Sequence, residues 1–161
     1  MTDRSTQKGV RAERILVVDD EKQICTIMVL MLHAAEYECC EATSGLEALA
    51  ILESGERFDL MLSNLLMPDL DGIRLLEHTK KKYPEMTVVM VTGVHDVSVA
   101  LAAIRNGAYD YLLKPFEREQ LLDTVSRALE NRRHRLEHRA HVSSLEAQVA
   151  TLTEQLRGRK S

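Results

Sequence analysis

Short apolar runs alternate with longer amphipathic runs through most of the chain, and this alternation restricts the fold more than any other feature. Such a pattern is typical of a parallel sheet with helical crossovers. Since these crossovers are right-handed, it predicts an open, doubly wound α/β sheet with its site at the carboxyl ends of the strands. The expected strands are 15–20, 37–43, 58–64, 86–93 and 109–113. The expected helices are 21–35, 44–55, 72–83, 95–107 and a last one from Glu117.

The last helix is too long for one small domain to cover. From Glu117 the helical pattern continues without Gly or Pro until Gly158, which is about 60 Å at 1.5 Å per residue. Its apolar residues alternate spacings of three and four, as in a short coiled coil: Val142, Leu145, Val149, Leu152 and Leu156. This stripe either folds back on its own domain or pairs with a second chain. Its distance from the domain favours a homodimer.

We therefore divide the chain into a disordered tail (1–13), one globular domain (14–130) and a helical, coiled-coil extension (131–161). The tail lacks the apolar core of a signal peptide. The longest apolar run, Ile24 to Leu32, is far shorter than the roughly 20 residues of a membrane span. These features predict a cytoplasmic protein with no membrane partner. A net charge of −4 argues against a general nucleic-acid-binding surface.

Polar side chains follow four of the expected strands, at the point where each strand ends. Asp19 and Asp20 close the first strand, Asn64 the third and Thr92 the fourth, and Lys114 follows the fifth. We expect all five to converge, because the carboxyl ends of parallel strands share one edge of a sheet. Two adjacent carboxylates need a compensating cation, and oxygen ligands of this kind suit Mg²⁺. With a lysine and a hydroxyl beside them, they could hold a phosphoryl group.

The pair Asp19-Asp20, the segments "LLMPDLDG", "VTG" and "GAYDYLLKP", and the order of elements together resemble the receiver domain of bacterial two-component response regulators. The resemblance covers about Arg14 to Glu130. It implies a flavodoxin-like five-stranded parallel sheet in the order 2-1-3-4-5 and Mg²⁺ as the cofactor. It implies a histidine kinase or phosphotransfer protein as one partner and an effector domain or protein as another. Such a domain is a signalling receiver rather than an enzyme, although the family assists its own phosphorylation and dephosphorylation.

The resemblance assigns the metal site to four positions. Asp20 would bind Mg²⁺ directly, Asp19 would act largely through water, and the carbonyl of Leu66 would be a further ligand. The fourth position, which is also the phospho-acceptor, is Asn64. An aspartyl phosphate needs a carboxylate nucleophile, and an amide oxygen is far poorer. The chain is therefore not expected to be phosphorylated at the usual place.

Two explanations of Asn64 remain open. It is either a substitution introduced into an otherwise competent receiver, which holds it in the inactive state, or a natural feature of a pseudo-receiver. In the second case the chain would act as a protein–protein adaptor through its coiled coil. The presence of every other site residue favours the first explanation. Asp69 and Asp71, in the following loop, are not expected to reach the geometry of the acceptor.

The resemblance also assigns the phosphoryl and switch residues. Thr92 and Lys114 would contact the phosphoryl oxygens. Tyr111 would be an aromatic switch that turns inward when Thr92 moves, although a Tyr in a strand is also commonly half-buried packing. The Lys114-Pro115 bond is often cis in this family.

The remaining candidates have simpler explanations. His134, His138 and His141 share one helical face, a spacing that could bind a metal. Four arginines surround them and would oppose a cation, so a solvated basic face is the preferred interpretation: Arg132, Arg133, Arg135 and Arg139. No helix-turn-helix accompanies these residues, and direct DNA binding is not expected. Three cysteines lack metal or disulfide spacing and are expected in the core: Cys25, Cys39 and Cys40.

Overall fold

The computed structural model describes residues 11–93 and 97–158. Its centre is a parallel five-stranded sheet in the order β2-β1-β3-β4-β5, which confirms the expected topology. All four pairings between neighbouring strands are parallel. The strands are β1 Arg14–Val18, β2 Glu38–Ala42, β3 Leu60–Asn64, β4 Thr87–Thr92 and β5 Asp110–Leu113.

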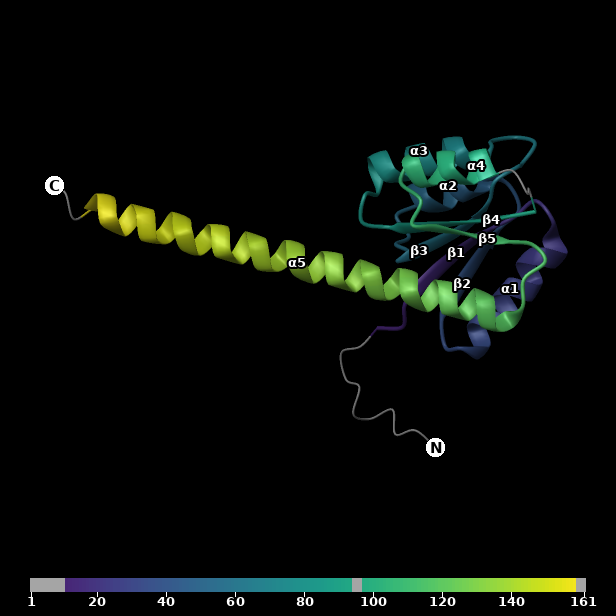
Figure 1. The fold of residues 1–161 in the computed structure, drawn as a ribbon, viewed down its shortest axis with the longest axis horizontal. Coiled ribbons are helices and arrows are strands. Elements are labelled where there is room, and N and C mark those ends of the chain that lie inside the picture. Colours follow the sequence, from purple (N-terminus) through teal and green to yellow (C-terminus); the bar gives the residue numbers. More distant parts are fainter. Residues whose placement is uncertain (1–10, 94–96, 159–161) are drawn as a thin grey trace, which may run out of the picture.

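Helices cover both faces of the sheet, with α2, α3 and α4 on one side and α1 and α5 on the other (Figure 1). Side chains alternate between the two faces along each strand. In β1, Leu16 and Val18 join the core under α2 and α3, whereas Ile15 and Val17 join the core under α1 and α5. The helices are α1 Lys22–Ala34, α2 Gly45–Glu53, α3 Gly72–Lys82, α4 Val97–Arg105 and α5 Arg118–Gly158.

Several element ends differ from the expected ones. β1 ends at Val18, so Asp19 and Asp20 lie in the turn that follows. The reason is local: the Asp19 carboxylate accepts the Glu21 N–H at 2.9 Å, which bends the chain towards α1. α4 ends at Arg105, just before Gly107, whose φ of 107° is left-handed. Ser44 caps α2 as expected, since its hydroxyl accepts the Glu47 N–H.

Parts of three expectations lie outside the described residues. These are residues 1–10 of the expected tail, residues 95–96 of the expected fourth helix and residues 159–161 of the expected extension. The thiols are all free, but only Cys25 is buried, and Cys39 and Cys40 are half-buried against the two cores. Within the described ranges, no helix combines the length and apolarity that a membrane crossing requires.

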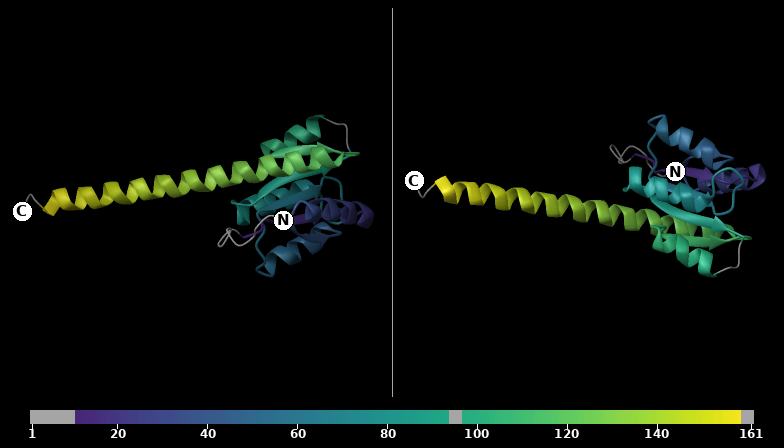
Figure 2. Two further views of the ribbon diagram at one scale, coloured as in Figure 1. Left: turned by 90° about the horizontal axis from the view of Figure 1, so that it is seen from below. Right: turned by 90° about the horizontal axis from the view of Figure 1, so that it is seen from above.

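The last helix is continuous, as predicted. α5 has 41 residues, about 60 Å in length, and its second half extends away from the domain in every view (Figure 2). Its first turns pack on the sheet through Leu121, Val125, Ala128 and Leu129, all fully buried. The part beyond Arg139, residues 140–158, is called the stem below. The stem does not fold back: its apolar residues are 37–62% exposed, namely Val142, Leu145, Val149, Leu152 and Leu156.

The arginines at the base of the stem are mostly exposed, as a basic face would be, but they are engaged by partners. Arg132 pairs with Asp59 at 3.1 Å and donates to the Glu85 carbonyl oxygen. One turn on, Arg135 donates to the buried Thr87 hydroxyl at 2.7 Å. We call Arg132, Arg135 and Arg139 the arginine clamp; the last of them pairs with the Glu85 carboxylate at 3.0 Å. The clamp ties α5 to the amino-terminal edge of the sheet.

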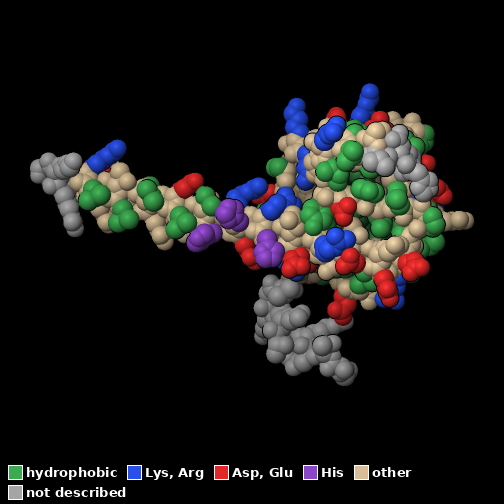
Figure 3. Space-filling model, in the orientation of Figure 1, with side chains coloured by type: hydrophobic (Ala, Val, Ile, Leu, Met, Phe, Trp, Pro, Cys, Tyr) green, Lys and Arg blue, Asp and Glu red, His purple; other side chains and the backbone are tan. Residues whose placement is uncertain are grey.

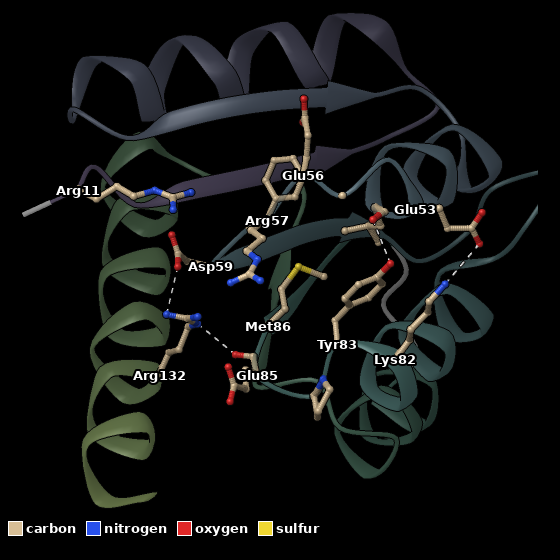
Figure 4. Close-up of a pocket in the computed structure, with 14 residues that line it drawn as sticks. Arg11, Glu53, Glu56, Arg57, Asp59, Lys82, Tyr83, Glu85, Met86 and Arg132 are labelled. Atoms are coloured by element: carbon tan, nitrogen blue, oxygen red, sulfur yellow. Dashed lines mark hydrogen bonds and ion pairs between the residues drawn. The ribbon is translucent and has the colours of Figure 1, made fainter. Parts of the chain in front are cut away.

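A cleft of about 840 Å³ lies at this same edge. Figure 4 shows Arg132 on one side of it, between Asp59 and Glu85. The cleft is open, and its lining has equal numbers of cations and carboxylates: Arg11, Arg57, Lys82 and Arg132 against Glu53, Glu56, Asp59 and Glu85. Balanced charge gives the cleft no general attraction for an ion of either sign. Its charged residues mainly hold neighbouring elements together.

Candidate functional site

The sheet brings the predicted site residues to its carboxyl edge. β1 and β3 are neighbours, while the chain reaches β2 on the far side of β1, so the strand order switches beside β1. Ligand sites of open α/β sheets lie at such a switch. Asp19 and Asp20 follow β1, and Asn64 ends β3 directly beside them. Asn64 is only 8% exposed and Asp19 1% exposed, so both are held inside the site.

The Asn64 side chain makes hydrogen bonds to three groups at the site. Its amide nitrogen Nδ2 donates to Asp20 Oδ1 at 2.9 Å and to the Leu66 carbonyl at 3.0 Å. Its Oδ1 accepts the Leu65 N–H at 3.0 Å. Because Oδ1 must face a donor, the amide orientation is fixed by the network. Both of its N–H groups therefore point at oxygens.

Asp19 is paired with the lysine that follows β5. Lys114 Nζ lies 2.5 Å from Asp19 Oδ2, and the two side chains are 16% and 1% exposed. The Lys114 backbone N–H donates to the Thr92 carbonyl at 2.8 Å, which aligns the loop with the end of β4. The Lys114-Pro115 bond is cis, as the family pattern implied. A buried carboxylate is thus compensated by a lysine across the sheet.

The predicted switch residues lie on neighbouring strands. Thr92 ends β4 and is 2% exposed, while Tyr111 in β5 is 40% exposed and pairs with Met90. Leu66 is 61% exposed, so only its backbone carbonyl faces the Asn64 amide. The structure therefore brings Asp20, Asn64 and the Leu66 carbonyl into direct contact. It places Thr92 at the adjacent strand end and Tyr111 nearer the surface.

The two loop acids are used elsewhere, as expected. Asp69 accepts the Leu46 N–H at 3.0 Å, and Asp71 caps α3 by accepting the Arg74 N–H at 2.8 Å. The hydrogen bond from the Leu46 backbone holds the pKa of Asp69 below its usual value. Neither acid can therefore supply the carboxylate that Asn64 lacks.

Gly72 lets the acceptor strand and α3 approach closely. A Cβ at this position would lie 2.4 Å from the Asn64 carbonyl oxygen and 2.8 Å from Leu65 Cα. Backbone atoms cannot move aside as a flexible side chain can, so any larger residue would displace the strand end. The glycine in "LLMPDLDG" thus has a direct structural role beside the site.

The oxygen atoms at this site are of the chemical type that binds a hard divalent cation. Two carboxylates, a carbonyl and an amide oxygen are ligands that Mg²⁺ accepts. In the described part of one chain, no three His, Cys, Asp or Glu side chains gather closely enough to hold a metal. The amide nitrogen of Asn64 now stands between Asp20 and Leu66. A cation there would require this amide to turn over and release the Leu65 N–H.

Backbone groups complete the site, and these were not predicted from the sequence. The Leu65 N–H fixes the Asn64 amide, and the Glu21 N–H accompanies Lys114 in binding Asp19. Every residue except proline carries such an N–H, so residue types give almost no signal for them. The strand-to-turn geometry after β1 and β3 selects them.

The strand order and the polar cluster at the strand ends define the class: an α/β signalling receiver with a CheY-like fold. The chain belongs to the response regulator receiver domain family, whose model matches residues 15–126. Domains of this family are signalling domains rather than classical enzymes.

Relatives and solved structures agree with this membership. The chain is 34% identical over 139 residues to the transcriptional regulatory protein ZraR of Escherichia coli K12, and 35% identical over 123 residues to the DNA-binding transcriptional regulator NtrC of Salmonella typhimurium. These matches cover 86% and 76% of this chain but only 29% and 25% of the relatives.

Among solved structures, a CheY-like receiver domain protein of Methanospirillum hungatei JF-1 matches with a TM-score of 0.74 and 32% identity, covering 78% of this chain and 99% of the other. NtrX of Brucella abortus, solved in complex with ADP, matches with a TM-score of 0.75 and 36% identity, covering 79% and 29%. The chain therefore corresponds to the receiver portion of longer regulators.

Proposed function

We propose that this chain is a receiver whose acceptor site is closed to phosphorylation by Asn64, and that it passes its state to a second copy through α5. The observation that carries the first part is the Asn64 amide, which donates to Asp20 and to the Leu66 carbonyl at 2.9 and 3.0 Å. By resemblance to the receiver family, these two oxygens would be ligands of Mg²⁺. The amide satisfies them instead, and its one oxygen is engaged by the Leu65 N–H.

The rest of the site supports a phosphoryl-receiving origin. Lys114 and Thr92 lie at the strand ends beside Asp19, where a cation and a hydroxyl would bind phosphoryl oxygens. With a carboxylate at position 64, a histidine kinase or phosphotransfer protein would be the donor. Mg²⁺ would neutralise the charge on the transferring group. Tyr111 would then turn inward as Thr92 moves.

Asn64→Asp tests this proposal and distinguishes a kinase-linked receiver from a phosphorylation-independent adaptor. Treated with acetyl phosphate and Mg²⁺, the Asn64→Asp chain should gain one phosphoryl group by intact mass, whereas the unchanged chain should gain none. Asn64→Asp together with Lys114→Ala should lose most of the labelling. Absence of labelling in Asn64→Asp would favour the phosphorylation-independent adaptor.

The second part rests on the stem. Five apolar side chains at heptad spacing are exposed there, and the domain of the same chain does not reach them. A parallel coiled coil with a second chain would bury them and place both receivers at one end. The apolar stripe spans about four turns, a length at which an isolated helix is marginal, but α5 is already ordered by the domain. The dimer should therefore be moderately tight.

Leu145→Asp with Leu152→Asp tests the dimer. The variant should be a folded monomer by sedimentation, with its far-UV CD spectrum retained. Ser144→Asp with Thr151→Asp has the same added charge and spacing on another helix face, and it should remain dimeric. A dimer in the first variant would place the interface elsewhere.

The stem would also transmit the state of the receiver to an effector. Since the chain spans less than a third of ZraR and NtrC, we propose that an effector domain or protein acts downstream of α5. A change in stem packing would be what it detects.

A further inference from the structure

We propose a binding site for a divalent transition metal at the base of the stem, formed by His134 and His138 of two paired chains. The inference depends on the proposed pairing of α5 and adds a ligand to it. The receiver site does not use these histidines. Figure 3 shows histidines gathered where α5 leaves the domain, with hydrophobic side chains along the stem beyond them.

The histidines occupy the same strip of helix surface as the apolar stripe. His138 precedes Leu145 by seven residues, and Leu145 precedes Leu152 by seven. His138 is therefore a core position of the same heptad repeat. His134 lies one turn earlier, so the two rings are neighbours on one face. Both residues are exposed, and both line a shallow groove that continues to Val142.

Four arginines surround the two histidines, and each of them is engaged by a partner. Arg132 and Arg139 lie about 120° and 100° around the helix from His138 and pair with Asp59 and Glu85. Two others are also engaged, Arg133 by Glu13 at 3.4 Å and Arg135 by Thr87 and Asn131. Arg135 and Arg139 nevertheless line the same groove as the histidines, and Arg135 lies only about 60° around the helix from His138. A metal bound by the histidines would therefore lie beside two guanidinium groups that are already engaged, one by Thr87 and Asn131 and one by Glu85.

Glu130 lies one turn before His134, with Oε1 at 3.7 Å from Nε2, which is within ion-pair range but too long for a hydrogen bond. Metal-binding histidines commonly give their second ring nitrogen to a carboxylate, which fixes the ring. Glu130, His134 and His138 thus follow one another at intervals of four residues on a single face. A closer approach of Glu130 would be needed for its carboxylate to fix the His134 ring.

Two chains are needed to complete the site. One chain brings two imidazoles, which is half of a tetrahedral set. In a parallel pair the two copies of a core residue face each other across the axis, so His138 would meet His138 of the second copy, with a His134 on either side. Neutral imidazole suits Zn²⁺, Cu²⁺ and Ni²⁺. Metal binding would then tighten the dimer at the point where the stem meets the receivers.

The test is sedimentation of the metal-free full chain with and without Zn²⁺. A ligand that binds only the dimer lowers the dissociation constant of the dimer. The factor is one plus the ratio of the free ligand concentration to the ligand's own dissociation constant. Zn²⁺ at ten times that constant should therefore lower the dimer dissociation constant about tenfold. His134→Ala and His138→Ala should each lose most of this response. His33→Ala, an exposed histidine on α1, should keep it.

The outcomes separate this proposal from the dimer itself. A chain that dimerises through Leu145 and Leu152 but does not respond to Zn²⁺ overturns the metal site alone. A Zn²⁺ response that persists in His138→Ala also overturns it. A Zn²⁺-dependent dimer that survives Leu145→Asp with Leu152→Asp would instead contradict the pairing of the stems, because the metal would then be bridging other surfaces.

Discussion

Changing Asn64 to Asp should make the folded receiver depend on a divalent cation. Two hydrogen bonds would be lost, one to the Asp20 carboxylate and one to the Leu66 carbonyl. A bond to a charged group contributes about 1.5–3 kcal/mol, and a neutral one about 0.5–1.5 kcal/mol. The new carboxylate would also face Asp20, which is exposed, adding repulsion on the order of 1 kcal/mol. We expect about 3 kcal/mol of destabilisation without metal, after the new side chain relaxes towards water.

Mg²⁺ should restore most of this loss. At one hundred times its dissociation constant a bound ion contributes about 2.7 kcal/mol. In the unchanged chain Mg²⁺ should bind more weakly, since Asn64 supplies no third carboxylate and its amide already bridges Asp20 and Leu66. Asn64→Asp should therefore be the less stable chain in EDTA and nearly equal to the unchanged chain in saturating Mg²⁺.

Urea unfolding followed by far-UV CD, in EDTA and in Mg²⁺, measures both effects. Asn106→Asp is the matched control, because it makes the same charge change at an exposed position after α4, and it should respond little to Mg²⁺. Equal stability of Asn64 and Asn64→Asp in EDTA would refute the role given to the amide. Equal or tighter Mg²⁺ binding by the unchanged chain would contradict the assigned metal ligands.

Three further predictions concern residues that lie away from the site. Thr79 is fully buried and its hydroxyl has no hydrogen-bond partner among the described residues, so Thr79→Val should raise the unfolding free energy by about 1 kcal/mol; a loss in urea unfolding would contradict this. Arg132→Ala should lower it by about 1–2 kcal/mol, since a half-buried clamp pair is broken. Arg133→Ala breaks a more exposed pair and should cost under about 1 kcal/mol. Burial raises the pKa of the Cys39 thiol to about 11. In a variant without the other two thiols, the rate of Cys39 labelling by iodoacetamide should therefore keep rising above pH 9. A rate that levels off near pH 9 would show an ordinary thiol.

The sequence predicts the sheet and the residues that form the site, because both follow from patterns among residues that are close together in the chain. Apolar runs locate the strands, and parallel strand ends must meet, so Asp20 and Asn64 are brought together by topology alone. The direction of a long side chain on an exposed helix has no such local determinant. Arg132 and Arg135 look solvated in the sequence, yet they pair with residues 73 and 48 positions away, Asp59 and Thr87. Only the packing angle of α5 on the sheet decides this.

That packing angle links the two ends of the molecule. Asp59 directly precedes β3, which ends at Asn64, and Thr87 begins β4, which ends at Thr92. Both strands are buried along their whole length, so they move as rigid rods rather than by stretching. A change in strand tilt at the acceptor end would therefore reach the arginine clamp at the other end. The stem extends about 28 Å beyond Arg139, and a tilt of about 5° would move its tip by roughly 2–3 Å. Because this displacement is perpendicular to the stem, it would change the distance and the angle between two stems paired as proposed, although atoms within the receiver would shift by less.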